Sequence, residues 1–294
     1  MSGDLDSRAP AQKPANASWT DTASGKSQAT ENFPVASRII APAERRHVLA
    51  FYTFARAADD VADHAVLAPE AKLARLEAFA KALDDDTRSE PPEAAQLRRS
   101  LAETGVSSAH AHHLLQAFRQ DATKQRYHAW SDLLLYCAYS AAPVGRYLLD
   151  LHRESRSIWP AADALCNALQ VINHLQDCRD DHAALDRVYL PTLWFAAEGI
   201  TVSALAERAT SPALRRVLDR TLDRVDELLI AADPLPRALA SRRLALQSAI
   251  TLAIARRLSQ RLRRRDPLVR RVRLGAWDYL IATATGVASL LSWR

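Results

Sequence analysis

Apolar residues recur three and four positions apart along most of this chain, which is the spacing of amphipathic α-helices. The pattern predicts helices over 43–63, 69–83, 93–103, 107–121, 131–150, 158–181, 202–209, 211–232, 236–264 and 276–291. Prolines punctuate these segments, among them Pro143, Pro160, Pro191, Pro234 and Pro267. Runs of alternating β-branched residues, which are typical of strands, are scarce. We therefore expect an all-α fold.

The same pattern predicts one helical domain with a tail at each end. Residues 1–31 are polar, lack an apolar leader segment and are typical of a disordered tail, so order is expected to begin near Asn32. No fixed-period repeat or shift in composition marks a second domain. We assign 32–275 to a single domain and 276–294 to an apolar C-terminal helix. Its uncharged run is too short for a membrane span, so the helix could pack on the core or lie on a bilayer.

Charge narrows the choice of partners. The net charge is +5, which favours nucleic acid, a membrane surface or a diphosphate as partner. Much of the excess comes from nine arginines near the C-terminus, for which a solvated helix face is the default interpretation: Arg256, Arg257, Arg261, Arg263, Arg264, Arg265, Arg270, Arg271 and Arg273. Aromatic residues are not interleaved with them as in nucleic-acid-binding segments, so no nucleic-acid partner is expected.

Three further groups of residues resemble metal or disulfide sites only superficially. The cysteines at 137, 166 and 178 lack CxxC spacing and are interpreted as buried thiols in a reducing cytoplasm. His110, His112 and His113 lie near a helix start without a partner cluster, which favours surface histidines. The acidic run 84–86 lies in a segment bounded by prolines and predicts a loop.

Two polar stripes interrupt the apolar helices. Tyr52, Arg56, Asp59 and Asp63 are spaced four, three and four apart and share one helix face. A second stripe has the spacing three, four and four: Gln170, Asn173, Asp177 and Asp181. Because an unpaired buried carboxylate is costly, we expect a cation to meet each stripe.

Mg²⁺ is the cation that these stripes favour. It takes oxygen ligands and often binds one or two carboxylates together with substrate phosphates. The chain has no P-loop and no GxGxxG motif, so backbone binding of phosphate is not expected. A single DxxxD pair is most often a solvated face or an ion pair. Two pairs, each embedded in apolar sequence, indicate a candidate metal site.

The motifs around these aspartates resemble the squalene/phytoene synthase family. The resemblance rests on 32–37, 51–63, 168–181 and 185–191 and covers about residues 32–275, with both aspartate motifs in the expected order. Within the family the chain is most similar to the bacterial hydroxysqualene synthases of hopanoid biosynthesis (the HpnC group), with support from 118–127 and 136–146. The resemblance implies an isoprenoid-synthase-type helical bundle with a central active-site cavity.

The resemblance also assigns roles to individual residues. It implies that Asp59, Asp63, Asp177 and Asp181 bind Mg²⁺ and act in catalysis with Arg56. It places eight further residues at the substrate: Tyr52, Asp60, Asp121, Asn173, Gln176, Asp180, Arg187 and Tyr189.

Two departures from the family pattern bear on the reaction. Head-to-head synthases usually have a tyrosine where this chain has Ala138, and often an arginine where it has Gln176. Both argue against condensing two farnesyl diphosphates. They favour a hydroxysqualene synthase that converts presqualene diphosphate and water to hydroxysqualene and diphosphate, without a nicotinamide cofactor. We expect the cationic intermediate to rearrange in an apolar pocket lined by residues such as Phe51, Phe54, Leu169 and Ile172.

The rival interpretations are a one-step squalene synthase, a phytoene synthase and, more remotely, a non-catalytic assembly or binding factor of the same fold. Ala138 argues against the first two, and both intact DxxxD pairs argue against the third. We expect a cytoplasmic protein. Peripheral contact with the inner face of the membrane and transient contact with neighbouring pathway enzymes stay open.

Overall fold

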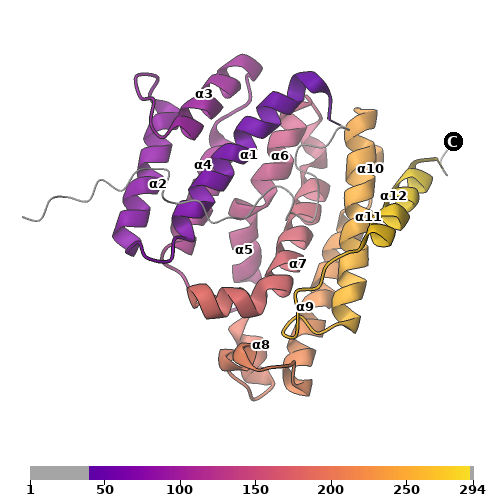
Figure 1. Cartoon of the computed structure of the whole chain (residues 1–294). Coiled ribbons are helices and arrows are strands. Elements are labelled where there is room, and N and C mark those ends of the chain that lie inside the picture. Colours follow the sequence, from indigo (N-terminus) through magenta and orange to yellow (C-terminus); the bar gives the residue numbers. More distant parts are fainter. Residues whose placement is uncertain (1–39, 292–294) are drawn as a thin grey trace, which may run out of the picture.

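A computed structural model describes residues 40–291, and its secondary structure is helical apart from one isolated bridge between Arg126 and Val188 (Figure 1). The predicted tail over 1–31 and the start of order at Asn32 lie outside the described residues. The α-helices are α1 (Pro42–Ala62), α2 (Pro69–Asp84), α3 (Pro92–Thr104), α4 (Ala109–Asp121), α5 (Trp130–Ser140), α6 (Ala142–Leu151), α7 (Trp159–Leu185), α8 (Thr192–Ala197), α9 (Pro212–Ala231), α10 (Leu235–Ala238), α11 (Arg242–Arg264) and α12 (Ala276–Leu291). Two short 3₁₀ helices are η3 (Arg156–Ile158) and η4 (Val202–Ala206).

The all-α prediction is confirmed, but two long predicted helices are broken. The segment 131–150 forms α5 and α6, which are separated at Ala141 (φ −119°, ψ −48°). Pro143 explains the break, because proline is tolerated in a first helical turn but cannot donate a hydrogen bond in a helix interior. The segment 236–264 forms α10 and α11, and Ser241 caps α11 by accepting a hydrogen bond from the Leu244 amide.

Other differences are smaller. The helix predicted over 202–209 is the short 3₁₀ helix η4, and α8 was not predicted, because a six-residue helix carries too few turns for its periodicity to stand out. The predicted loop at 84–86 is confirmed for Asp85 and Asp86, whereas Asp84 is the last residue of α2.

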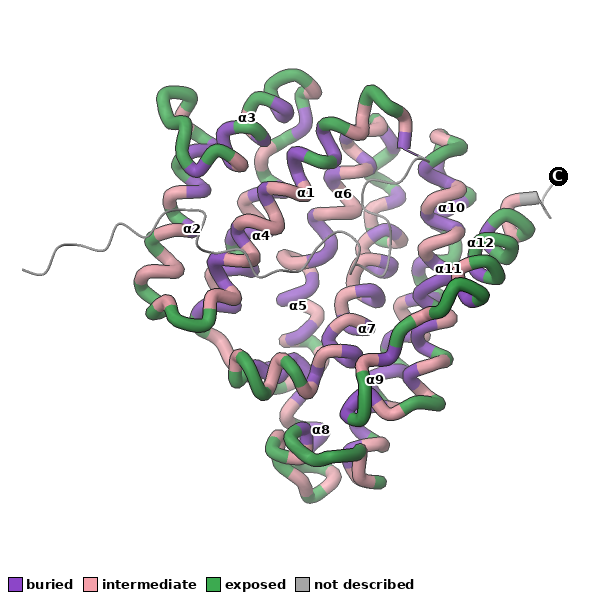
Figure 2. Tube along the Cα trace, viewed as in Figure 1, coloured by how far each residue is buried: buried purple, intermediate pink, exposed green. Residues whose placement is uncertain are grey.

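The core has two parts. One cluster of buried apolar side chains comes from α1, α2, α3, α4 and part of α6. A larger cluster includes side chains of α5, α7, α9, α10 and α11 (Figure 2). Helix α6 contributes to both, with Tyr147 in the first cluster and Leu149 in the second. Because the clusters meet along α6 and α7, any cavity between them is enclosed by helices from both halves of the chain.

Helix α12 packs antiparallel along the outside of α11 (Figure 1). At its start Asp278 pairs with Arg257 and Arg261. Near its end Gly286 lies so close to Ile250 that a Cβ atom at 286 would come within 2.8 Å of the Ile250 amide nitrogen. Glycine therefore permits the close approach of the two helices.

Gly286→Val is expected to destabilise the protein by about 1–3 kcal/mol, because the added side chain meets backbone that cannot move aside. Thermal unfolding measures the loss. Ala284→Val, on the exposed side of the same helix, is the matched control and is expected to change stability by less than about 0.5 kcal/mol. Equal stability of the two variants would contradict the close packing of α12 on α11.

The arginine-rich stretch is only partly the solvated face that its sequence suggested. Arg257 and Arg261 pair with the buried Asp278, and Arg263 bridges Asp223 and Asp226. These arginines hold α9, α11 and α12 together, so that part of the prediction is wrong. None of the described helices is long and apolar enough to cross a membrane.

Candidate active site

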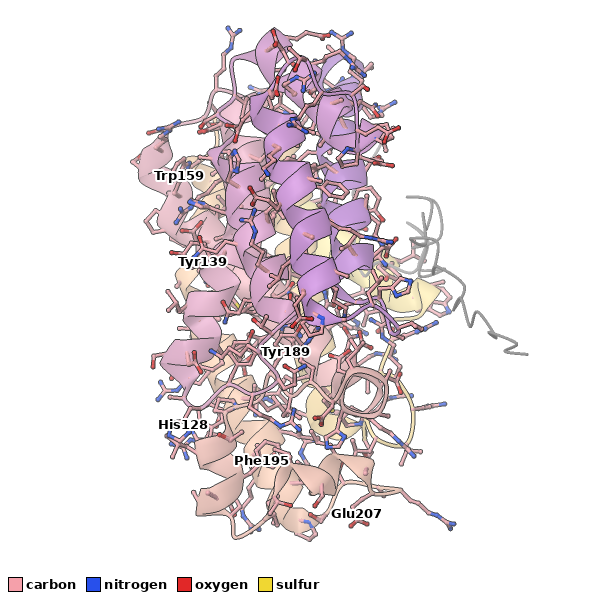
Figure 3. All side chains as sticks on the ribbon, turned by 90° about the vertical axis from the view of Figure 1, so that its left-hand side faces the viewer. His128, Tyr139, Trp159, Tyr189, Phe195 and Glu207 are labelled. Atoms are coloured by element: carbon pink, nitrogen blue, oxygen red, sulfur yellow. The ribbon has the colours of Figure 1, made fainter. Side chains whose placement is uncertain are left out.

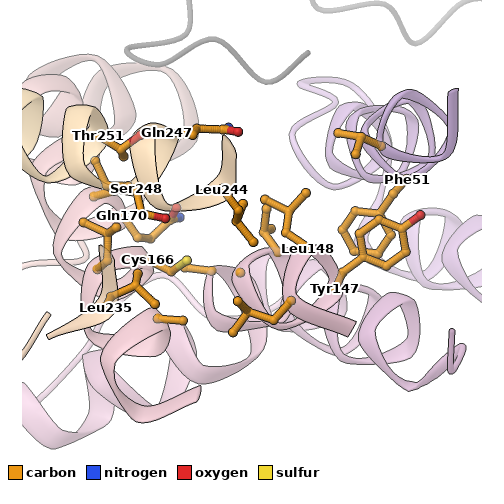
Figure 4. A pocket seen from close by; sticks show the side chains of 18 of the residues that line it. Phe51, Tyr147, Leu148, Cys166, Gln170, Leu235, Leu244, Gln247, Ser248 and Thr251 are labelled. Carbon is orange, nitrogen blue, oxygen red and sulfur yellow. The ribbon is translucent and has the colours of Figure 1, made fainter. Parts of the chain in front are cut away.

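An apolar cavity lies between the two core clusters (Figure 4). Helices α1, α6, α7 and α11 supply most of its wall, and Leu235 of α10 adds to it. Phe51 stacks on Tyr147 along the wall, with ring centroids 4.0 Å apart, and Leu169 lines the cavity as predicted. Phe54 and Ile172 do not line it. Both are fully buried in the core, so their predicted place in the wall is wrong.

Polar side chains mark one end of this cavity. On α1, Tyr52 and Ala55 line the cavity, and Asp59 and Asp63 follow one and two turns later. On α7, Gln170 and Asn173 line it, and Asp177 and Asp181 follow in the same way. On both helices the cavity-lining residues are therefore followed, toward the carboxyl-terminal end, by the predicted aspartate pair.

Arg56 neutralises two carboxylates on its own helix. Its guanidinium donates to Asp59 at 2.7 Å and to Asp60 at 2.8 Å. All three side chains are partly shielded from solvent, with at most 29% of each exposed. The cation that the first stripe required is therefore supplied in part from within the stripe.

Arg187 joins the ends of α1 and α7. Its guanidinium donates to Asp63 at 2.9 Å, to the Tyr189 hydroxyl at 3.0 Å and to the Asp121 carbonyl oxygen at 2.8 Å. Helix α7 ends at Leu185, and Asp186 takes a left-handed φ of 47°. This turn directs the chain back to the bundle and places Arg187 within it.

Asp121, at the end of α4, is buried and accepts hydrogen bonds from Tyr136 at 2.7 Å and from Tyr189 at 2.9 Å. Burial raises the pKa of Asp121 to about 6, against the opposing effects of Arg187 and the Tyr136 hydrogen bond. Burial also raises the pKa of Tyr189, and Asp121, Asp181 and Asp63 add to that rise. Asp121 is the carboxylate in direct contact with this phenol.

Asp121→Asn is expected to change how stability depends on pH in the metal-free protein. Because the folded pKa of about 6 lies above the unfolded value near 3.8, the wild type is favoured where Asp121 is protonated and loses that advantage as pH rises. As the pH rises from 3.8 to about 6, the unfolding free energy of the wild type should fall by about 3 kcal/mol relative to the variant. Urea unfolding across that pH range measures the difference.

Asp132→Asn is a control for which the opposite pH dependence of stability is expected. Burial acts to raise the pKa of Asp132, but hydrogen bonds from Lys124 and the His128 amide outweigh it and hold that pKa low. The wild type should therefore lose stability relative to this variant as pH falls. A slope of the same sign for both variants would show that the Asp121 carboxyl does not titrate as its burial requires.

An aromatic stack around Tyr189, which is labelled in Figure 3, lies beside Arg187. The rings of His174 and Tyr189 stack with centroids 3.5 Å apart, and Tyr127 stacks on Tyr189 at 5.3 Å. Burial, with help from Arg187, lowers the pKa of His174 to about 3, so the imidazole is neutral at physiological pH. Gln170, which lines the cavity, approaches the His174 ring at 3.3 Å.

A C-terminal strap, residues 265–275, crosses the aspartate end of α7. Arg271 forms an ion pair with Asp177, with nitrogen–oxygen distances of 2.7 and 2.9 Å. Gln176 is buried and donates to the Val272 carbonyl oxygen, and Arg179 donates to the Leu268 carbonyl oxygen. Gln176 thus fixes the strap, and Arg271 brings a cation to the second aspartate stripe.

The structure brings most of the predicted site residues together. Tyr52 and Asn173 line the cavity, and Asp121, Arg187 and Tyr189 form one hydrogen-bonded network with Asp63. Asp180 is exposed on α7.

Four contributors were not identified as site residues from the sequence: Lys72, which donates to the Ala62 carbonyl oxygen, and Tyr136, His174 and Arg271. His174 stands four positions after Gln170 on the same helix face, and this spacing was a usable signal.

The other predicted side chains have structural roles. His110 is buried against Asp150 at 3.0 Å, so its assignment to the surface is wrong, whereas His112 is partly exposed and pairs with Asp84 at 2.8 Å. Cys137 and Cys178 are buried as expected, and Cys166 is half-buried at the cavity wall. Between residues 40 and 291, no three His, Cys, Asp or Glu side chains converge closely enough to hold a metal ion by themselves.

Comparison with known proteins decides the family. The profile of the squalene/phytoene synthase family matches residues 27–278. This chain belongs to the squalene/phytoene synthase family. The resemblance of its motifs is thereby confirmed, and the coarse function follows: the chain is an enzyme of a family that acts on prenyl diphosphates.

Individual relatives agree with this assignment. The chain is 44% identical to the hydroxysqualene synthase of Rhodopseudomonas palustris over 92% of its own length and 93% of that protein. It is 42% identical to the hydroxysqualene synthase of Zymomonas mobilis, with 85% of this chain and 84% of that protein covered.

A solved structure, the squalene synthase HpnC of Alicyclobacillus acidocaldarius, matches with a TM-score of 0.70 and 30% identity, over 81% of this chain and 90% of the other. A dehydrosqualene synthase structure matches with a TM-score of 0.78 at 20% identity, over 89% and 92% of the two chains, and supports the fold alone. The predicted isoprenoid-synthase-type bundle is confirmed.

Proposed function

We propose that this protein is a hydroxysqualene synthase, which converts presqualene diphosphate and water to hydroxysqualene and diphosphate. The observation that carries the proposal is the 42–44% identity to three hydroxysqualene synthases over 85–92% of the chain. Ala138 supports it, because the residue that usually accompanies condensation of two prenyl diphosphates is absent.

Mg²⁺ is the metal that suits the proposed diphosphate site. Asp59, Asp63, Asp177 and Asp181 offer only oxygen donors, which a hard cation prefers. One or two carboxylates are enough for Mg²⁺, because substrate oxygens and water complete its coordination. When bound, Mg²⁺ would supply Lewis-acid stabilisation of the departing diphosphate.

The remaining polar residues act on the same leaving group. Arg56 and Arg187 are cations beside Asp59 and Asp63, so they are placed to bind an anion that enters with its metals. Arg271 adds a third cation at Asp177. The Tyr189 hydroxyl and the Asp121 carbonyl oxygen accept from Arg187 and hold its guanidinium in place. Tyr52 and Asn173 line the cavity nearby. Preorganised charge of this kind stabilises the negative charge that develops as the diphosphate leaves.

The cavity supplies the environment for the hydrocarbon. Its wall is mostly apolar. Phe51, Leu148 and Leu244 line it (Figure 4), and Leu169 does so as well. Such a wall excludes bulk water, so a carbocation can rearrange before it is captured. The few polar groups inside, such as Gln170 and Thr251, can hold the single water that the reaction consumes.

Product analysis tests the proposal. Purified protein with Mg²⁺ is given presqualene diphosphate or farnesyl diphosphate in separate reactions, each with and without NADPH. We expect hydroxysqualene from presqualene diphosphate, with no dependence on NADPH. Squalene or phytoene formed from a simple prenyl diphosphate would overturn the proposed reaction but keep the family, and no turnover by folded protein would favour a binding factor.

A further inference from the structure

Much of helix α12 is exposed to solvent (Figure 2), and its exposed residues are uncharged and mostly apolar. Trp277 is 77% exposed, Leu280 60% and Ile281 44%. The outer stripe of α12 consists of exposed residues three and four positions apart: Trp277, Leu280, Ile281, Ala284, Val287 and Ala288. Contiguous exposed apolar surface of this kind marks an interaction site more often than isolated apolar residues do.

The packing of α12 on α11 fixes which side of the helix faces outward. Asp278 is 1% exposed and pairs with Arg257 and Arg261, and no other residue from 276 to 291 is charged. Gly286 holds the other end of the helix against the Ile250 backbone. Rotating α12 to bury the outer stripe would break both contacts. The outward position of the stripe is therefore built into the fold.

Unpaired positive charge lies next to the stripe. Four arginines in and beside the strap that leads into α12 are exposed, and none forms an ion pair with another described residue: Arg264, Arg265, Arg270 and Arg273. The neighbouring Arg257, Arg263 and Arg271 all pair with aspartates. Four exposed arginines without an ion-pair partner among the described residues therefore precede the apolar helix within the stretch 264–273.

We propose that the outer stripe of α12 and these four arginines form a docking surface for an anionic lipid bilayer. An interfacial helix buries an apolar face, with tryptophan among its side chains, just below the headgroups, while basic residues contact anionic lipids. Charge complementarity favours this partner over a second copy, because every copy carries the same cationic group and a net charge of +5. The proposal does not depend on which prenyl diphosphate the enzyme uses.

Vesicle co-sedimentation with the full-length protein tests this surface. We expect binding to vesicles of phosphatidylcholine with about one third phosphatidylglycerol, weakened by salt, and much weaker binding to phosphatidylcholine alone. Trp277→Ser/Leu280→Ser should weaken binding at least about tenfold. The matched control Leu135→Ser/Ile230→Ser, which alters equally exposed apolar residues elsewhere, should bind like the wild type.

The charge is tested in parallel. Arg270→Ser/Arg273→Ser should weaken binding about 30-fold, whereas Arg99→Ser/Arg208→Ser, which removes two exposed arginines elsewhere, should leave it unchanged. Product assays with detergent-dispersed substrate should be unaffected by the stripe variant, which separates this proposal from the enzyme's chemistry. The proposal would be overturned if a double variant and its matched control weakened vesicle binding equally. It would also be overturned if the protein bound no vesicles but formed a dimer, and if Trp277→Ser/Leu280→Ser converted that dimer to a monomer.

Discussion

Asp177→Asn is expected to lower kcat for hydroxysqualene formation by about 10²–10³-fold, while the protein stays folded. The substitution keeps the shape of the side chain but removes the negative charge that pairs with Arg271 and is proposed to bind Mg²⁺. The loss should fall on kcat because metal-held charge matters most as the diphosphate leaves. Turnover of presqualene diphosphate is measured over a titration of Mg²⁺, and the variant should need more metal to reach its residual rate.

A matched variant separates this effect from the loss of an ion pair. Asp233 likewise forms an ion pair with an arginine, Arg256, away from the cavity that α1 and α7 line. Asp233→Asn should keep turnover within about twofold of the wild type, since exposed ion pairs contribute little. Full activity of Asp177→Asn at the wild-type Mg²⁺ requirement would remove Asp177 from the metal site.

The aspartate stripes could be predicted from sequence because they are local. The spacing from Tyr52 to Asp63 is a property of a single helix, and α1 forms over those residues as expected. The same holds for Gln170 to Asp181 on α7. Periodicity also predicted the all-α class and most helix positions. It could not predict the break at Ala141, because a proline near position 143 is compatible with either a kink or a new helix start.

The partners of the stripes could not be predicted, because they are tertiary. Arg271 meets Asp177 from 94 positions further along the chain, and the arginine-rich composition around it suggested a solvated face instead. The spacing of His174 from Gln170 can place it on the stripe's face, but nothing local indicates that Tyr189 stacks on it. Likewise, Phe51 and Phe54 are equally apolar in sequence. Only the packing of α1 puts one at the cavity and the other in the core.

Arg187→Met is expected to destabilise the protein by about 3–5 kcal/mol, because it leaves buried partners of an ion-pair network without their cation. Arg187 is 5% exposed and donates hydrogen bonds to Asp63, to the Asp121 carbonyl oxygen and to the Tyr189 hydroxyl. Methionine fills similar volume, so the loss reports charge and hydrogen bonding more than packing. Urea unfolding at neutral pH measures the change in free energy.

Arg263→Met is the matched control for this last prediction. Arg263 also bridges two carboxylates, Asp223 and Asp226, but 32% of its side chain is exposed. Water can solvate the carboxylates that this variant leaves behind, so its loss should stay within about 1 kcal/mol. At low pH, protonation of Asp121, whose pKa burial raises to about 6, should recover part of the stability of Arg187→Met. Equal losses for both variants, with no recovery in acid, would mean that Arg187 contributes no more than a surface arginine.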